Sequence, residues 1–169
     1  MQQFKRLALI ATMLLACVGC DQTTKSLARE HLQGHSSASY FGDTLRLQYV
    51  ENPGAFLSLG ESMSHRWRAA ILTVGVGVVL TSVLVFVIRT PTCSPVQTLA
   101  LTLICGGGIG NLVDRVRYDG YVTDFLNVGL GPIRTGIFNV ADVVLMIGIA
   151  LFIFWQTRVK QSQDRGRTT

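Results

Sequence analysis

The chain has 169 residues, of which 49% are hydrophobic and only 15% are charged. A soluble domain averages about 25% charged residues, so this composition disfavours a water-soluble protein and points to lipid. The net charge of +5 comes without a basic stripe interleaved with aromatic residues, so the sequence does not predict a nucleic-acid partner.

The first apolar segment is short. It runs from Leu7 to Cys20 as 14 uncharged residues, roughly 21 Å as a helix, against a bilayer core of about 30 Å. Such a segment resembles a bacterial lipoprotein signal, so one hypothesis is a secreted lipoprotein whose mature chain begins at Cys17 or Cys20. Because three longer apolar segments follow, we predict instead a retained spanning helix over about residues 7–24.

The three later segments reach the length that a spanning helix needs. They cover residues 69–88, 95–113 and 137–155, and only Asp142 interrupts the last one. Four spans place both termini on one side of the membrane. The basic residues near the helix ends are densest in the short flanks on that side, so we expect cytoplasmic termini. The polar tail, 156–169, is expected to be flexible.

The two loops between the spans, residues 25–68 and 114–136, are expected to face outward. In the first, Leu45, Leu47 and Tyr49 alternate with other residues in the manner of a half-buried strand, and Asn-Pro-Gly at 52–54 predicts a turn. In the second, a tight turn at 119–120 precedes a similar alternation. The sequence therefore predicts an all-α membrane protein of one domain, residues 1–169, with four transmembrane helices and a small extracytoplasmic β-sheet element.

The outer ends of these helices and the second loop collect polar residues at one membrane face. Asp142 is expected about five residues into the last helix, where an ionisable side chain is a functional candidate by default. If Asp124 folds onto it, the two carboxyls share a proton, because like charges at close range do not both ionise easily. One carboxyl then takes a proton from water while the other polarises a scissile carbonyl, which is peptide hydrolysis without a covalent intermediate.

An alternative keeps Asp142 structural. In a small polytopic transporter or scaffold, Asp142 would pair with Arg115 and only hold helices together. Other chemistries lack their motifs, because the chain has neither H-E-x-x-H nor G-x-S-x-G and its three histidines lack ligand spacing. We therefore expect no metal and no cofactor.

Several small or charged residues have a simpler structural interpretation. Gly106 and Gly110 form a G-x-x-x-G pair, which lets helices approach closely. Asp21 and Lys25 are spaced i, i+4 and are expected to form an ion pair or to orient the helix end. The four cysteines are interpreted as small apolar residues packed among helices.

Five motifs then occur in order along the chain, and together they resemble the lipoprotein signal peptidases, the signal peptidase II family of four-span bacterial aspartyl peptidases. They are DQTTK (21–25), NPGAF (52–56), GGGIGNLVDR (106–115), VTDF (122–125) and FNVAD (138–142). Many relatives read N-T-G-A-A-F at the second motif, so this chain is one alanine shorter there.

The resemblance implies an enzyme that removes signal peptides from diacylglyceryl-modified prolipoproteins, cutting just before the lipidated cysteine. It implies that Asp124 and Asp142 are the catalytic pair. It also implies that substrate-binding or dyad-supporting positions fall on Asn52, Gly54, Asn111, Arg115, Asn139 and Asp21. The implied setting is the bacterial inner membrane, with membrane lipid and prolipoproteins as partners, globomycin-like peptides as inhibitors, and a monomer as the working form.

Overall fold

The structure is a computed structural model that describes residues 2–54 and 64–167. Four of its helical segments are long and apolar enough to cross a membrane, which confirms the predicted fold class. The helices are α1 (Gln2–Leu32), α2 (His65–Ala69), the π-helical η2 (Ala70–Gly75), α3 (Val76–Arg89), α4 (Pro95–Arg117) and α5 (Val140–Arg167). The motif residues Ala55 and Phe56 lie outside the described part.

Two helices continue beyond the ends that the sequence predicts. Helix α1 continues past residue 24 to Leu32, because Lys25 and Ala28 are buried against other elements and keep this part of the helix packed. Helix α5 continues past residue 155 to Arg167. Its polar extension contains good helix formers and no proline. The length of an uncharged run therefore reflects the thickness of the bilayer core that the helix crosses, and it does not give the full length of the helix.

Helix α4 lies at the centre of the bundle, and its start follows standard capping chemistry. The hydroxyl of Ser94 accepts a hydrogen bond of 3.1 Å from the backbone N–H of Gln97, and Pro95 occupies the first turn. Its glycines let the other helices approach closely, as the G-x-x-x-G pair predicts, because an added Cβ would clash at each. Gly106 faces Cys17 of α1, Gly107 faces Ala141 of α5, Gly108 faces Leu80 of α3, and Gly110 faces Asp21 of α1.

The two loops build one antiparallel sheet of four strands in the order β1-β2-β3-β4, as the sequence predicts for its two longer strands. The strands are β1 (Ala38–Tyr40), β2 (Leu45–Asn52), β3 (Val122–Leu130) and β4 (Ile133–Arg134). Strands β2 and β3 pair with Asn52 opposite Val122, and Val50 lies opposite Asp124. This register places the turn after β2 beside Asp124.

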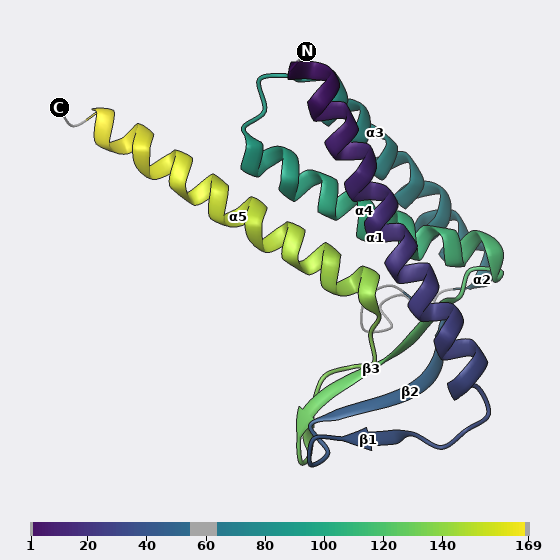
Figure 1. Cartoon of the computed structure of the whole chain (residues 1–169). Coiled ribbons are helices and arrows are strands. Elements are labelled where there is room, and N and C mark those ends of the chain that lie inside the picture. The colour runs from purple at the N-terminus through teal and green to yellow at the C-terminus, as the bar shows by residue number, and fades with distance from the viewer. Residues whose placement is uncertain (1, 55–63, 168–169) are drawn as a thin grey trace.

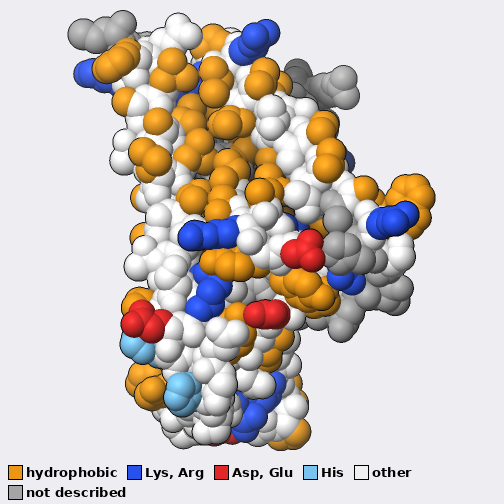
Figure 2. Space-filling view, turned by 90° about the vertical axis from the view of Figure 1, so that its right-hand side faces the viewer, with side chains coloured by type: hydrophobic (Ala, Val, Ile, Leu, Met, Phe, Trp, Pro, Cys, Tyr) orange, Lys and Arg blue, Asp and Glu red, His pale blue; other side chains and the backbone are white. Residues whose placement is uncertain are grey.

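The molecule has two distinct ends. Figure 1 shows the sheet at one end of the helices, here called the sheet end, and both termini at the other, here called the terminal end. Large hydrophobic side chains are exposed along the helices between these ends, among them Leu15, Val78, Phe86 and Ile153. Hydrophobic side chains also gather over the helical part in Figure 2. Such an apolar belt is the surface that a bilayer covers.

Candidate active site

Asp124 lies in β3 and is almost completely buried, with 2% of its surface exposed. Its two carboxyl oxygens accept hydrogen bonds from two amides, Asn52 Nδ2 at 2.9 Å and Asn139 Nδ2 at 2.6 Å. Burial raises the pKa of Asp124 to about 6, and the nearby charge of Asp142 also raises it, while the two amide hydrogen bonds lower it. Asp124 is therefore an acid whose proton is held more tightly than in water.

Asp142 is the third residue of α5, so the prediction that it lies about five residues into the helix is wrong. It forms a reciprocal cap with Asn139. The backbone N–H of Asn139 donates to Asp142 Oδ2 at 3.1 Å, and the backbone N–H of Asp142 donates to Asn139 Oδ1 at 3.0 Å. This is a capping box, which fixes both side chains at the start of a helix. The helix start thereby holds the Asp142 carboxyl in place.

One asparagine joins the two carboxyls. Asn139 is fully buried, and its Nδ2 donates both to Asp124 Oδ1 and to Asn111 Oδ1, the latter at 3.1 Å. Asn111 in turn donates from its Nδ2 to Asp142 Oδ1 at 2.8 Å. The loop carboxyl and the helix carboxyl are therefore held in one network of amides, with Asn139 in contact with both.

The turn after β2 closes over Asp124. The side-chain oxygen of Asn52 accepts the backbone N–H of Gly54 at 2.9 Å, which forms the predicted turn, while its amide nitrogen faces Asp124. Arg115 donates from Nη2 to the carbonyl oxygen of Gly54 at 2.8 Å. Asn52 thus caps a turn and contacts a candidate catalytic residue at the same time, and Arg115 holds that turn from α4.

The described contacts of Arg115 test the alternative in which Arg115 pairs with Asp142 and the pair only holds helices together. Besides Gly54, this guanidinium donates to the carbonyl oxygen of Asn111 at 3.5 Å. The hydrogen bonds that Asp142 accepts come from Asn111 and Asn139. Among the described ion pairs none joins Arg115 to Asp142, so the pairing that a transporter or scaffold would need is not formed.

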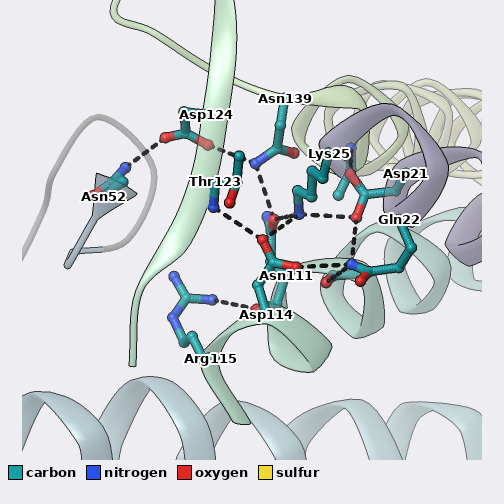
Figure 3. A network of polar contacts seen from close by, with 12 residues as sticks. Asp21, Gln22, Lys25, Asn52, Asn111, Asp114, Arg115, Thr123, Asp124 and Asn139 are labelled. Carbon is teal, nitrogen blue, oxygen red and sulfur yellow. Dashed lines mark hydrogen bonds and ion pairs between the residues drawn. The ribbon is translucent and has the colours of Figure 1, made fainter. Parts of the chain in front are cut away.

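A buried cluster of charges lies behind these residues (Figure 3). Lys25 has none of its surface exposed, and its Nζ lies 2.8 Å from Asp21 Oδ2 and 3.4 Å from Asp114 Oδ2. The predicted Asp21–Lys25 ion pair is therefore confirmed. Asp21 also accepts the backbone N–H of Ala141 at 2.9 Å. It thus holds α1 against the start of α5 and makes no described contact with either candidate catalytic carboxyl.

Two members of this cluster connect it to the site. The Nζ of Lys25 donates to Asn111 Oδ1 at 2.8 Å, and Asp114 accepts the backbone N–H of Thr123, next to Asp124, at 2.9 Å. Sequence reasoning did not assign Lys25, Gln22, Asp114 or Thr123 to the site. The signal for Lys25 is its spacing from Asp21, because residues at i and i+4 share one helix face.

An apolar groove leads to Asp142 along α5. It has a volume of about 470 Å³, and Asp142 is the only ionisable side chain among the described residues that line it. The lining consists of Thr135, Gly136, Phe138, Asp142, Val143, Met146, Ile147 and Ala150. A groove of this kind accepts an aliphatic group and brings it beside a carboxyl. In the described part of the chain no group of three or more His, Cys, Asp or Glu side chains is placed to hold a metal ion.

Comparison with known proteins finds relatives that cover most of the chain. Residues 13–158 match the family model described as signal peptidase (SPase) II. The lipoprotein signal peptidase of Syntrophotalea carbinolica is 36% identical over 159 residues, which cover 92% of this chain and 93% of that protein. The lipoprotein signal peptidase of Moorella thermoacetica is 34% identical over 149 residues, which cover 88% and 89%.

Solved structures share the fold. One bacterial membrane enzyme structure, determined by the in meso method at 2.3 Å resolution, superposes with a TM-score of 0.80 at 23% identity, covering 92% of this chain and 91% of that chain. A second, at 1.9 Å resolution, gives 0.74 at 24% identity over 88% and 92%. With the family model matching most of its length, this chain belongs to the signal peptidase II family, and it is a multi-pass bacterial membrane protein.

Proposed function

We propose that Asp124 and Asp142 are the catalytic pair of an aspartic endopeptidase. The enzyme removes signal peptides from diacylglyceryl-modified prolipoproteins by cutting just before the lipidated cysteine. The observation that carries the proposal is Asn139, whose side-chain amide donates to the Asp124 carboxyl and whose backbone N–H donates to the Asp142 carboxyl. Asp142 also lines an apolar groove. Membership of the signal peptidase II family supports the reaction, and the geometry supports the two residues.

The surroundings of the two carboxyls suggest different tasks. Asp124 is buried and its pKa is raised, so it is suited to hold the shared proton and to polarise the scissile carbonyl. Asp142 is only half-buried and lines the groove, so it is suited to take a proton from the attacking water. The roles of the two carboxyls exchange as the tetrahedral intermediate collapses.

The same groove accounts for a lipid-modified substrate. A diacylglyceryl chain that enters from the bilayer stays in contact with apolar side chains of α5 while the peptide reaches Asp142. Asn52, Gly54, Asn111, Arg115 and Asn139 support the dyad or line the approach to it, and Asp21 supports it from behind. The acyl chains thus never leave an apolar environment.

We also propose the setting in which the reaction takes place. The enzyme works as a monomer in the bacterial inner membrane, with cytoplasmic termini and the sheet on the outer face. The basic residues of the terminal end support this orientation, because dense Lys and Arg beside helix ends stay on the cytoplasmic side. Globomycin-like cyclic peptides are expected to compete with the substrate for the groove.

The test is a cleavage assay of a lipidated prolipoprotein with the purified enzyme. Asp124→Asn and Asp142→Asn keep the shape of each side chain but remove the acid–base chemistry, so turnover should fall about 10²–10⁴-fold or more. Asp119→Asn is the matched control, because Asp119 is exposed and has φ 51°, which asparagine tolerates. Near-normal turnover of either dyad variant would remove that residue from the mechanism.

A further inference from the structure

A second apolar groove lies at the terminal end, far from the candidate active site. It has a volume of about 560 Å³ and runs between α1 and the first turns of α4. Basic side chains meet apolar ones there, because Lys5 and Arg6 line it together with exposed Leu9 and Leu99. The described residues that line it are Lys5, Arg6, Leu9, Ile10, Met13, Cys93, Pro95, Thr98, Leu99 and Thr102.

Arg6 anchors α1 to the end of α3 but keeps its charge uncompensated. Its Nη2 donates to the carbonyl oxygens of Val87 and Thr90 at 2.7 and 3.0 Å, at the C-terminal end of α3. The other two nitrogens, Nε and Nη1, are buried and have no hydrogen-bond partner among the described residues. Carbonyl dipoles therefore partly satisfy this cation, and no carboxylate is among its described contacts.

The sequence contains few acids that could supply the missing negative charge. Residues 1–20 and 62–113, which include both walls of the groove and the loop before α4, contain no Asp or Glu. Nine of the ten acids lie between residues 21 and 142, and the tenth is Asp164. The N-terminal end of α4 adds its own positive dipole at the same place.

We propose that this groove binds an anionic phospholipid. The lipid phosphate lies at the groove mouth beside Lys5 and Arg6, and one acyl chain lies along Leu9, Met13 and Leu99. The apolar walls alone would accept the tail of any lipid, so the two cations decide the class of headgroup. A net negative headgroup compensates the charge that the protein leaves unpaired, whereas a zwitterionic headgroup carries its own cation into a positive site.

The experiment measures lipid binding to the intact chain in detergent micelles by native mass spectrometry. Phosphatidylglycerol and phosphatidylcholine with identical acyl chains are titrated separately, and the ratio of the two dissociation constants is the readout. Phosphatidylglycerol is expected to bind at least fivefold more tightly. Lys5→Gln should reduce that preference about fivefold, because each cation near an anionic lipid surface contributes about that factor. This variant leaves the Arg6 contacts with α3 in place.

Two further variants separate the groove from general surface charge. Arg158→Gln removes a cation from the same end of the molecule, on α5 and outside the groove, and should leave the preference unchanged. Leu99→Trp fills the groove without changing any charge and should weaken the binding of phosphatidylglycerol. Competition with inorganic phosphate tests whether a headgroup anion alone suffices, and we expect no displacement at millimolar phosphate.

Four results would overturn the proposal. These are equal binding of the two lipids, an equal loss of preference in Lys5→Gln and Arg158→Gln, unchanged phosphatidylglycerol binding in Leu99→Trp, and displacement of the lipid by free phosphate. The readout does not involve peptide cleavage, so it stands independently of the catalytic proposal.

Discussion

The ammonium group of Lys25 donates a hydrogen bond of 2.8 Å to the side-chain oxygen of Asn111. Because that oxygen faces an ammonium, which has only donors, the amide nitrogen of Asn111 must point the other way, and it donates to Asp142 at 2.8 Å. A fully buried cation on α1 therefore acts together with the Asn139 amide to orient an amide on α4, which in turn holds a candidate catalytic carboxyl on α5.

The first prediction concerns Lys25→Met, which keeps the length of the side chain and removes its charge. Asp21 is then left buried without its cation, and breaking a buried pair in this way costs about 3–5 kcal/mol of unfolding free energy. Thermal unfolding of the purified protein in micelles should show this loss. The turnover number should fall while KM changes little, because Lys25 does not line the groove.

A double variant separates the two effects of that change. Asp21→Asn combined with Lys25→Met removes both charges of the pair, so most of the lost stability should return. Turnover should stay low, because the side-chain oxygen of Asn111 has still lost the ammonium donor and keeps only the amide of Asn139. If turnover recovers together with stability, Lys25 has only a structural role.

The second prediction concerns Asn139. Serine is as good an N-cap as asparagine, so Asn139→Ser should preserve the start of α5, but its side chain is too short to bridge to Asp124. We expect near-normal unfolding with a large loss of turnover. Asn139→Ala should lose turnover and, in addition, about 1 kcal/mol of stability. Full activity of the serine variant would show that the bridge between the two carboxyls is unnecessary.

The third prediction follows from the raised pKa of Asp124. Between its ordinary value of 3.8 and about 6, the folded protein holds a proton on Asp124 that the unfolded chain releases. Unfolding therefore releases a proton in this window, and the stability that this carboxyl contributes is lost as pH rises from about 4 to 6. The side chain at position 124 no longer titrates in Asp124→Asn. The unfolding free energy of this variant should therefore rise relative to that of the wild type by up to about 3 kcal/mol between pH 4 and 6, and it should not rise further at higher pH.

Comparing the unfolding midpoints of the two proteins from pH 4 to pH 7 checks this sign. The charge of Asp142 contributes to the raised pKa, so the window should move to lower pH in an Asp142→Asn background. A constant difference between Asp124→Asn and the wild type at all pH values would mean that Asp124 is not held in a desolvated site.

The sequence predicts most of this architecture through patterns that are local. Uncharged runs mark the four helices, alternation marks strands β2 and β3, and the Asn-Pro-Gly turn marks the segment that closes over Asp124. Strands β1 and β4 have three and two residues, and an alternating pattern cannot be recognised in segments this short. They exist because β2 and β3 offer edges to pair with, which is a tertiary effect.

The distinction between local patterns and tertiary effects also explains which site residues the sequence does not predict. Asp142 stands out because it is a charge inside an apolar run, and that signal is local. Its capping role could be read from the spacing of Asn139 and Asp142, which is that of a capping box. The burial of Lys25 could not be predicted in this way, because it depends on Asp114 and Asn111, almost 90 residues further along the chain.

The last prediction tests the close approach of α4 and α5 that brings Asp142 to the network. An added Cβ at Gly107 would clash with the backbone oxygen of Ala141 and lie 2.9 Å from the Cβ of Leu145. The backbone cannot move aside as easily as a flexible side chain. Gly107→Ala should therefore lower the unfolding free energy by about 1–3 kcal/mol and displace the first turn of α5. Turnover should fall with it.

Gly19→Ala is the matched control, because nothing lies within 4 Å of an added Cβ at that helical position, and it should be neutral or stabilising by about 0.5–1 kcal/mol. Equal behaviour of the two variants, in unfolding and in cleavage, would mean that α4 and α5 are further apart than the glycines require and that Asp142 reaches its partners by another route.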